Sequence, residues 1–204
     1  MIVLIDNGHG RDTAGKRSPD GRLSEWEWTR QIARALCSRL QRRGIDARLL
    51  VPEDEDVPLR QRAARANAVA GPAILVSIHA NAAGMGRWMS ASGWCAFVAP
   101  AAGLEARRLA CLLASEAESA GLFVRRQECD RDYWEHPWAI CRLTRCPAVL
   151  TENCFMDNHA DCQWMLSTKG KETIISLHET AILHYLGLHP GAGGQSVGSP
   201  GAGD

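Results

Sequence analysis

The sequence carries no excess of charge of either sign and no long apolar run. Lys plus Arg and Asp plus Glu each number 23 among 204 residues, so nothing points to nucleic acid or an anionic membrane as a partner. No stretch reaches the roughly 20 apolar residues that cross a bilayer. Residues 1–10 also lack the basic region and cleavage site of a signal peptide. We therefore expect no transmembrane segment and synthesis in the cytoplasm.

Cysteine pairs with the spacing of a structural zinc site are missing too. Eight cysteines are present, but none forms a C-x2-C pair, and Cys37, Cys95 and Cys111 fall in apolar stretches. We expect buried free thiols in a reducing compartment. The alternative is a disulfide or a structural zinc built from the later cysteines, which are Cys141, Cys146, Cys154 and Cys162.

The apolar content is sufficient for one domain with a substantial core. Hydrophobic residues make up 46% of the chain, which suits a soluble globular domain of this length. We assign residues 1–189 to that domain. Residues 190–204 are rich in Gly, Ser and Pro, and we expect a disordered tail there.

Short apolar runs alternate with amphipathic helical patterns along the chain, as in α/β proteins. The expected strands are residues 1–6, 47–51, 74–82, 93–99, 139–143 (a weaker one) and 147–152. The expected helices are residues 24–43, 58–70, 104–120, 158–166 and 168–186. The acidic residues 53–56 and the charged residues 125–137 are expected to form loops.

Polar residues end two of these strands. The apolar run 74–82 contains His79 and Asn81, and residues 1–6 lead into Gly8 and His9. A lone histidine at a strand end is most often a hydrogen-bonded core or rim residue. Two at equivalent strand ends indicate a site, because ligands of open α/β sheets bind at the carboxyl ends of strands.

Three carboxylates accompany these histidines. Asp6 can orient an imidazole. Its position fits equally a turn residue whose carboxylate bonds to local amides. Ser24 and Glu27 have the spacing of a capping box, which leaves Glu25 free to face the site. Glu152 ends the strand at 147–152, and its alternative role is a carboxylate bonded to loop amides.

Two imidazoles and a carboxylate for a metal come from His9, His79 and Glu25. Glu152 supplies a further carboxylate that the metal does not need. Three protein ligands and an open water position are the composition of a catalytic zinc site. Zinc lowers the pKa of its water to about 7 and polarises a carbonyl, and a nearby Glu can shuttle the proton. The residues therefore predict one Zn²⁺ per chain and amide hydrolysis with Glu152 as general base and acid.

Other histidines and tryptophans are less informative. His178 and His184 are six residues apart, whereas a zinc helix needs histidines four apart, so we expect these two and Glu179 to be surface or flanking residues. Half or more of the tryptophans near the expected site are packing residues, and the others could stack on substrate. These tryptophans are Trp88, Trp94, Trp134 and Trp138.

Several motifs in order resemble one family. The matching stretches are IDNGHG, the glutamate that opens the first long helix, Leu59 with Arg62, Ala66-Asn67, SIHANA and PAVLTENCFMDN. They are similar to those of the zinc-dependent N-acetylmuramoyl-L-alanine amidases of the Amidase_3 type. The resemblance runs from Ile2 to Leu186. It departs at Asn7, where proline is common, in the loop 14–21, and at Cys154, where glycine or an aromatic is frequent.

The resemblance implies a single α/β domain with a mostly parallel, twisted sheet of about six strands flanked by helices. It implies zinc at His9, Glu25 and His79, with Glu152 catalytic. The implied substrate is the amide that joins N-acetylmuramic acid to L-alanine in peptidoglycan. Because that substrate lies outside the membrane, we expect either a phage or prophage endolysin released through a holin or a sequence without its leader.

Two other functions stay open. A zinc peptidase that cuts the stem peptides of peptidoglycan would use the same metal and glutamate. A wall-binding module without catalysis is the alternative outside enzymes. The sequence does not fix the host peptidoglycan or the oligomeric state.

Overall fold

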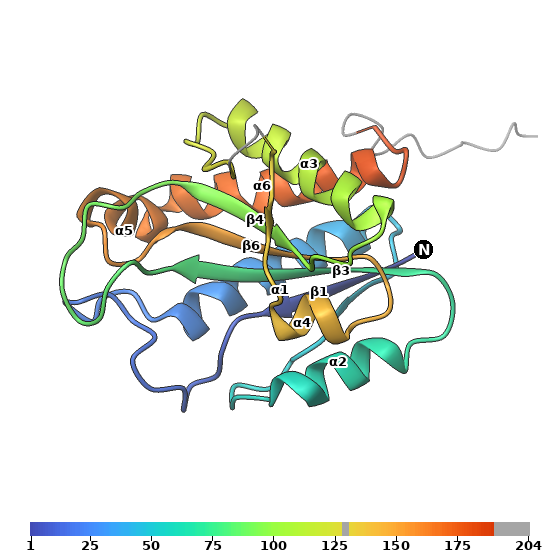
Figure 1. The fold of residues 1–204 in the computed structure, drawn as a ribbon, viewed down its shortest axis with the longest axis horizontal. Coiled ribbons are helices and arrows are strands. Elements are labelled where there is room, and N and C mark those ends of the chain that lie inside the picture. Colours follow the sequence, from blue (N-terminus) through green and yellow to red (C-terminus); the bar gives the residue numbers. More distant parts are fainter. Residues whose placement is uncertain (128–130, 190–204) are drawn as a thin grey trace, which may run out of the picture.

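The computed structural model describes residues 1–127 and 131–189, and the tail predicted at 190–204 lies outside them. The strands are β1 (Ile2–Asn7), β2 (Ala47–Leu49), β3 (Ala73–Asn81), β4 (Trp94–Val98), β5 (Trp134–Glu135) and β6 (Ala148–Phe155). The helices are α1 (Glu25–Arg42), α2 (Leu59–Asn67), α3 (Leu104–Ser119), α4 (Ala139–Leu143), α5 (His159–Leu166) and α6 (Thr168–Tyr185). Figure 1 shows them as one layered domain.

The strands form one six-stranded sheet in the order β2-β1-β3-β6-β4-β5. Every neighbouring pair is parallel except β4 and β6, which are antiparallel. The predicted α/β fold with a mostly parallel sheet of about six strands is therefore confirmed. Since β1, β3 and β6 run in the same direction, their carboxyl ends meet at one edge of the sheet.

Side chains that alternate along the strands supply two cores. Val3, Ile5 and Val76 pack with α1, α3 and α6 on one face of the sheet. Leu4 and Leu75 point to the other face and pack with residues of α2 and α4, which lie together below the sheet in Figure 1. Helices thus cover both faces, which explains why the central strands are almost wholly apolar.

The segment predicted as a weaker strand at 139–143 is wrong, because it is the short helix α4. Ile140 and Cys141 are buried on one side of this single turn. A five-residue, mostly apolar segment does not by itself distinguish a strand from a buried helical turn. The sixth strand is instead β5, two residues long, within the predicted loop 125–137.

The predicted capping box at the start of α1 does not form. Ser24 is the N-cap residue, but its side chain caps no amide, and Glu27 is exposed. Ser24 bridges Arg17 in an antiparallel pair, and the backbone N–H of Glu25 donates to the carbonyl of Lys16 at 2.9 Å. Backbone pairing therefore replaces the side-chain cap.

The expectation that His178 and Glu179 lie at the surface is also wrong. His178 is fully buried and Glu179 is 9% exposed. His178 Nε2 lies 3.0 Å from Thr151 Oγ1, and its Nδ1 lies 2.7 Å from the carbonyl of Ile174. His184 is partly exposed and pairs with Glu116 at 3.1 Å.

Two features concern the described residues alone. Their seven cysteines are free thiols, of which five are buried, whereas Cys111, which was expected to be buried, and Cys146 are partly exposed. Among the helices of residues 1–127 and 131–189, none is both long and apolar enough to cross a membrane.

Candidate metal centre

Strand register brings the predicted site residues to one edge of the sheet. His79 in β3 pairs directly with Glu152 in β6, and His9 follows the end of β1 beside them. Gly8 allows this approach, because a Cβ on it would lie 2.5 Å from Nδ1 of His79. No side chain at Gly8 would fit without moving the imidazole.

Glu25, the first residue of α1, reaches both imidazoles. Its Oε1 lies 3.2 Å from Nδ1 of His79 and accepts a hydrogen bond from the amide of Ala80 at 3.1 Å. Its Oε2 lies 3.4 Å from Nε2 of His9. One donor atom from each of these three side chains lies within 4.8 Å of the others, whereas Glu27 is exposed. The structure thus assembles the three predicted ligands in one cluster.

The donor set fits a zinc ion. Oε2 of Glu25 is buried and has no hydrogen-bond partner among the described residues, and such an atom costs free energy unless a cation or donor completes it. Two imidazole nitrogens and a carboxylate oxygen form a three-ligand set of the kind found in catalytic zinc sites.

Glu152 lies beside this cluster and faces the same cavity. A pocket of about 280 Å³ is lined by His9, Glu25, His79 and Glu152, and we call it the central pocket. Oε2 of Glu152 is buried without a hydrogen-bond partner in the described part of the chain. Glu152 is therefore not the amide-bonded loop carboxylate of the alternative interpretation.

The electrostatics of the cluster follow from burial and from mutual charge. Burial is the main cause that lowers the pKa of His9 to about 4; Glu25 opposes this shift, and the nearby His79 contributes to it. Burial is the main cause that raises the pKa of Glu152 to about 8. The charge of His79 opposes this upward shift, and the charge of Glu25 adds to it. Burial alone would raise the pKa of Glu25, but its hydrogen bond to His79 and the charges of both histidines lower it.

Asp6 acts on His79 through a serine. The hydroxyl of Ser77 donates to Oδ2 of Asp6 and lies 3.1 Å from Nε2 of His79. The Nδ1 atom of the same ring faces Glu25. Asp6 accepts hydrogen bonds from the side chains of Arg62 and Ser77, and its role in orienting an imidazole stays a prediction.

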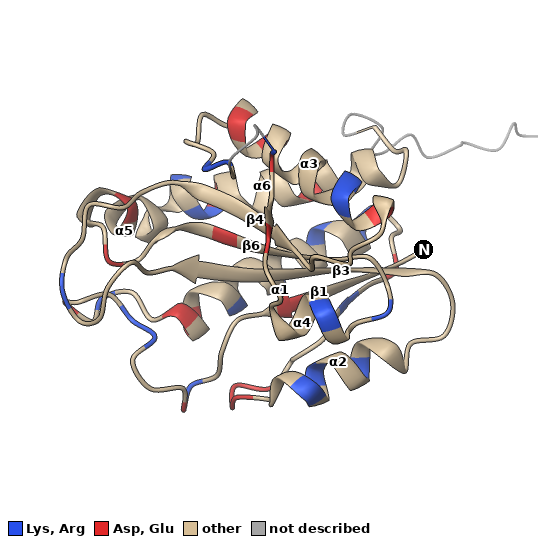
Figure 2. Cartoon of the chain, in the orientation of Figure 1, with Lys and Arg blue, Asp and Glu red and all other residues tan. Residues whose placement is uncertain are grey.

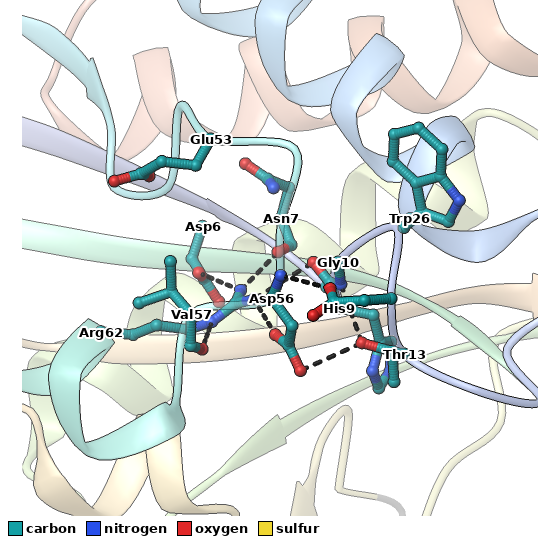
Figure 3. Close-up of polar contacts among 12 residues, drawn as sticks. Asp6, Asn7, His9, Gly10, Thr13, Trp26, Glu53, Asp56, Val57 and Arg62 are labelled. Atoms are coloured by element: carbon teal, nitrogen blue, oxygen red, sulfur yellow. Dashed lines mark hydrogen bonds and ion pairs between the residues drawn. The ribbon is translucent and has the colours of Figure 1, made fainter.

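Sequence reasoning missed the role of Arg62, which Figure 3 shows at the centre of a polar network. This guanidinium is 1% exposed and donates to Oδ1 of Asp6 at 2.9 Å, to the carbonyl of His9 at 3.1 Å and to Asp56 at 2.8 Å. Arg30 donates to the same His9 carbonyl at 2.9 Å. An arginine on the apolar side of the predicted helix 58–70 was the available signal.

His9 and Cys154 have φ angles of 60° and 69°. Positive φ is rare and strained for residues other than glycine, and it clusters at functional sites. His9 is held in this conformation by the two arginine bonds to its carbonyl. The value at Cys154 is one that glycine adopts without strain.

The other candidates lie in different surroundings. Asn81 lines the central pocket; its Oδ1 accepts from the amide of Ala82, and its Nδ2 donates to Sγ of Cys95. Of the tryptophans considered, Trp138 lines the pocket and is 40% exposed. Trp94 is a core residue that donates to Asn153, and Trp88 stacks on His159.

Comparison with known proteins agrees with this geometry. A family model described as N-acetylmuramoyl-L-alanine amidase matches residues 3–184. The N-acetylmuramoyl-L-alanine amidase CwlM of Bacillus licheniformis is 29% identical over 192 residues, which are 93% of this chain and 70% of that protein.

Solved structures show the same fold. An N-acetylmuramoyl-L-alanine amidase from Clostridium difficile 630 superposes with a TM-score of 0.79 at 26% identity, covering 91% of this chain and 96% of that one. The catalytic domain of CwlV from Bacillus (Paenibacillus) polymyxa var. colistinus gives 0.79 at 23% identity, covering 92% and 98%. The chain belongs to the N-acetylmuramoyl-L-alanine amidase family.

Proposed function

We propose that this protein uses one Zn²⁺, held by His9, Glu25 and His79, to hydrolyse the amide between N-acetylmuramic acid and L-alanine in peptidoglycan. The observation that carries the proposal is the central pocket. It combines two imidazoles with two buried carboxylates, each having an oxygen without a hydrogen-bond partner among the described residues. Metal-assisted amide hydrolysis uses groups of these kinds, imidazoles and a carboxylate to hold the metal and a second carboxylate to transfer protons.

When bound, the ion supplies a Lewis acid that polarises the scissile carbonyl and lowers the pKa of a coordinated water to about 7. The protein supplies the proton transfers. Glu152 lines the pocket, and the positive charge of a bound ion would lower its pKa below the value of about 8 that burial gives. The ionised carboxylate would then accept a proton from the attacking water, and the resulting carboxylic acid would protonate the departing amine of L-alanine. Ser77 and Asp6 keep the ring of His79 oriented with Nδ1 toward Glu25.

Replacing Glu152 by Gln tests this role. The change keeps the shape of the side chain and removes the base, so turnover should fall by about 10²- to 10⁴-fold while the zinc content stays at one per chain. Activity and metal content are measured on the same sample. A variant that hydrolyses at nearly the original rate, or that loses its zinc, would remove Glu152 from this role.

Mass spectrometry of digested peptidoglycan tests the reaction itself. We expect new L-alanine amino termini and intact glycan strands. New termini inside the stem peptides would identify a peptidase, and the absence of products would identify a wall-binding module.

We further propose that the protein acts on the wall as an endolysin after release through the membrane. Peptidoglycan is the substrate class of its family, and it lies outside that membrane. Expression in a host cell with and without a holin should produce lysis only when the holin is present. Lysis without the holin would contradict this release route.

A further inference from the structure

A second pocket, of about 420 Å³, lies at the other end of β6 from Glu152. It forms where β4 ends and β6 begins, between the first turn of α3 and the C-terminal part of α4. We call it the α3–α4 pocket. Its lining includes Ala102, Ala106, Arg142, Thr144, Arg145 and Ala148.

Two arginines without partners line this pocket. Arg142 and Arg145 are both exposed, and within residues 1–127 and 131–189 neither guanidinium makes a hydrogen bond or an ion pair. Figure 2 shows basic residues on α4 and on the loop that follows it. Most other arginines of the fold pair with an acid or a carbonyl, so these two are available for an anionic ligand.

A buried hydroxyl points to the same conclusion independently. Thr144 lines the pocket and is 9% exposed, and its Oγ1 is buried with no hydrogen-bond partner in the described part of the chain. Buried hydroxyl groups are normally satisfied. A ligand oxygen in the pocket would supply the missing acceptor.

The start of α3 adds a partial positive charge. This helix has 16 residues, and its N-cap, Gly103, offers no side chain to its first-turn amides. Gly103, Glu105 and Ala106 line the pocket, and the N-terminus of a helix attracts anions. The carboxylate of Glu105 accepts from the hydroxyl of Tyr185 at 2.9 Å and lies 3.6 Å from Arg108, so its own charge is partly compensated.

The rest of the lining is apolar and favours a carboxylate attached to a small apolar body. Pro137, Ala99 and Ala102 form walls, and burial raises the pKa of the Cys141 thiol to about 12, which keeps it neutral. The terminal residue of a peptide has this combination of a small side chain and a carboxylate. Arg is well suited to bind that group with paired hydrogen bonds.

The two pockets lie on one face of the sheet, on either side of α4. Ala148 lines the α3–α4 pocket and Glu152 lines the central pocket. Residues four apart on a strand share a face and are about 13 Å apart. Trp138 and Ile140 at the start of α4 border the central pocket, whereas Arg142 near its end borders the other. An extended peptide of about four residues covers this distance.

We propose that the α3–α4 pocket binds the terminal carboxylate of the peptide that begins with the L-alanine of the substrate. This inference rests on the proposed function, because it needs the L-alanine amide in the central pocket. The peptide then runs across α4 toward Arg142 and Arg145. Stems of about four residues with a free terminal carboxylate are the preferred substrates, and amidated or cross-linked ends are disfavoured.

The test compares two synthetic muropeptides that share a four-residue stem and differ in its end, a free carboxylate or a carboxamide. Wild type should cleave the carboxylate form with a kcat/KM roughly tenfold higher, the size expected for a charge-assisted hydrogen bond. The double variant Arg142→Gln/Arg145→Gln should lose this preference, mainly through KM, and keep its activity on the carboxamide. Lys169→Gln is the matched control, because Lys169 is exposed on α6 and lines neither pocket.

A second variant, Thr144→Val, removes only the unpartnered hydroxyl. It should reduce the preference for the carboxylate form and keep the melting temperature of wild type. Equal cleavage of the two muropeptides by wild type, or equal losses on both in the arginine variant, would overturn the proposal. Failure of the proposed function has a different signature, since wild type would then release L-alanine amino termini from neither muropeptide.

Discussion

At the scale of single residues, we expect the position of one carboxylate in the first turn of α1 to decide whether this edge of the sheet holds a metal. Glu25 is 1% exposed and contacts both histidines, whereas Glu27, two residues later, is exposed. Residues two apart on a helix point in nearly opposite directions. The pair therefore provides a matched comparison.

We expect Glu25→Ala to lose bound zinc and activity, because only two of the three donors remain. Glu27→Ala should retain both and change the free energy of unfolding by less than about 0.5 kcal/mol, the usual range for surface substitutions, since Glu27 makes no capping bond. Metal analysis and urea unfolding of the two variants check this. Retention of a full zinc equivalent by Glu25→Ala would show that another group replaces it.

At the scale of elements, Arg62 connects helix α2 to the end of β1. Its guanidinium binds the carboxylate of Asp6 and the carbonyls of Asn7 and His9. Asp6 is 1% exposed and in turn holds Ser77 against His79. The network thus couples the packing of one helix to the orientation of a predicted zinc ligand.

Arg62→Ala should destabilise the protein by about 3 to 5 kcal/mol, because it leaves the charge of Asp6 buried and unpaired. The stability of Arg62→Lys should lie between those of wild type and Arg62→Ala, since an ammonium keeps the charge but cannot make the same set of hydrogen bonds. Urea unfolding at pH 7 measures the difference. Arg60→Ala on the same helix is the control, because Arg60 is exposed, and an equal cost for the two alanine variants would refute the role of the network.

At the scale of the whole molecule, a buried histidine couples stability to pH. His178 of α6 is fully buried against Thr151 of β6, and burial lowers its pKa from 6.5 to about 4, although its bond to the carbonyl of Ile174 opposes the shift. Between these two values the unfolded chain binds a proton that the folded chain does not. Stability therefore falls as the pH falls through this window, and it is unaffected by His178 above it.

The expected loss from His178 is about 2 kcal/mol between pH 7 and pH 5, at about 1.4 kcal/mol per pH unit below 6.5. Glutamine does not titrate in this range. The free energy of unfolding of His178→Gln should therefore fall by about 2 kcal/mol less than that of wild type between pH 7 and pH 5, whatever its stability at pH 7. Urea unfolding of both proteins at the two pH values gives the comparison. His9 also has a lowered pKa, but it contributes equally to both proteins and cancels. Parallel losses in the two proteins would contradict the assignment.

Much of the candidate site could be predicted from the sequence, because its residues are tied to strand ends. Continuous apolar runs identify buried parallel strands, and His9, His79 and Glu152 each stand where such a run ends. Parallel strands place those ends at one edge whatever the details of packing. Glu25 could be predicted for a related reason, because it opens a helix that follows the first of these strands.

Other features depended on tertiary contacts between residues distant in the sequence. The segment 139–143 forms a helix whose Ile140 and Cys141 pack in one cluster with Leu150. Ser24 makes a backbone bridge with Arg17 and does not cap the helix with its side chain. A local pattern cannot specify which partner a backbone amide or a guanidinium will meet. For the same reason the partners of Arg62 and His178, and the α3–α4 pocket, are properties of the folded chain alone.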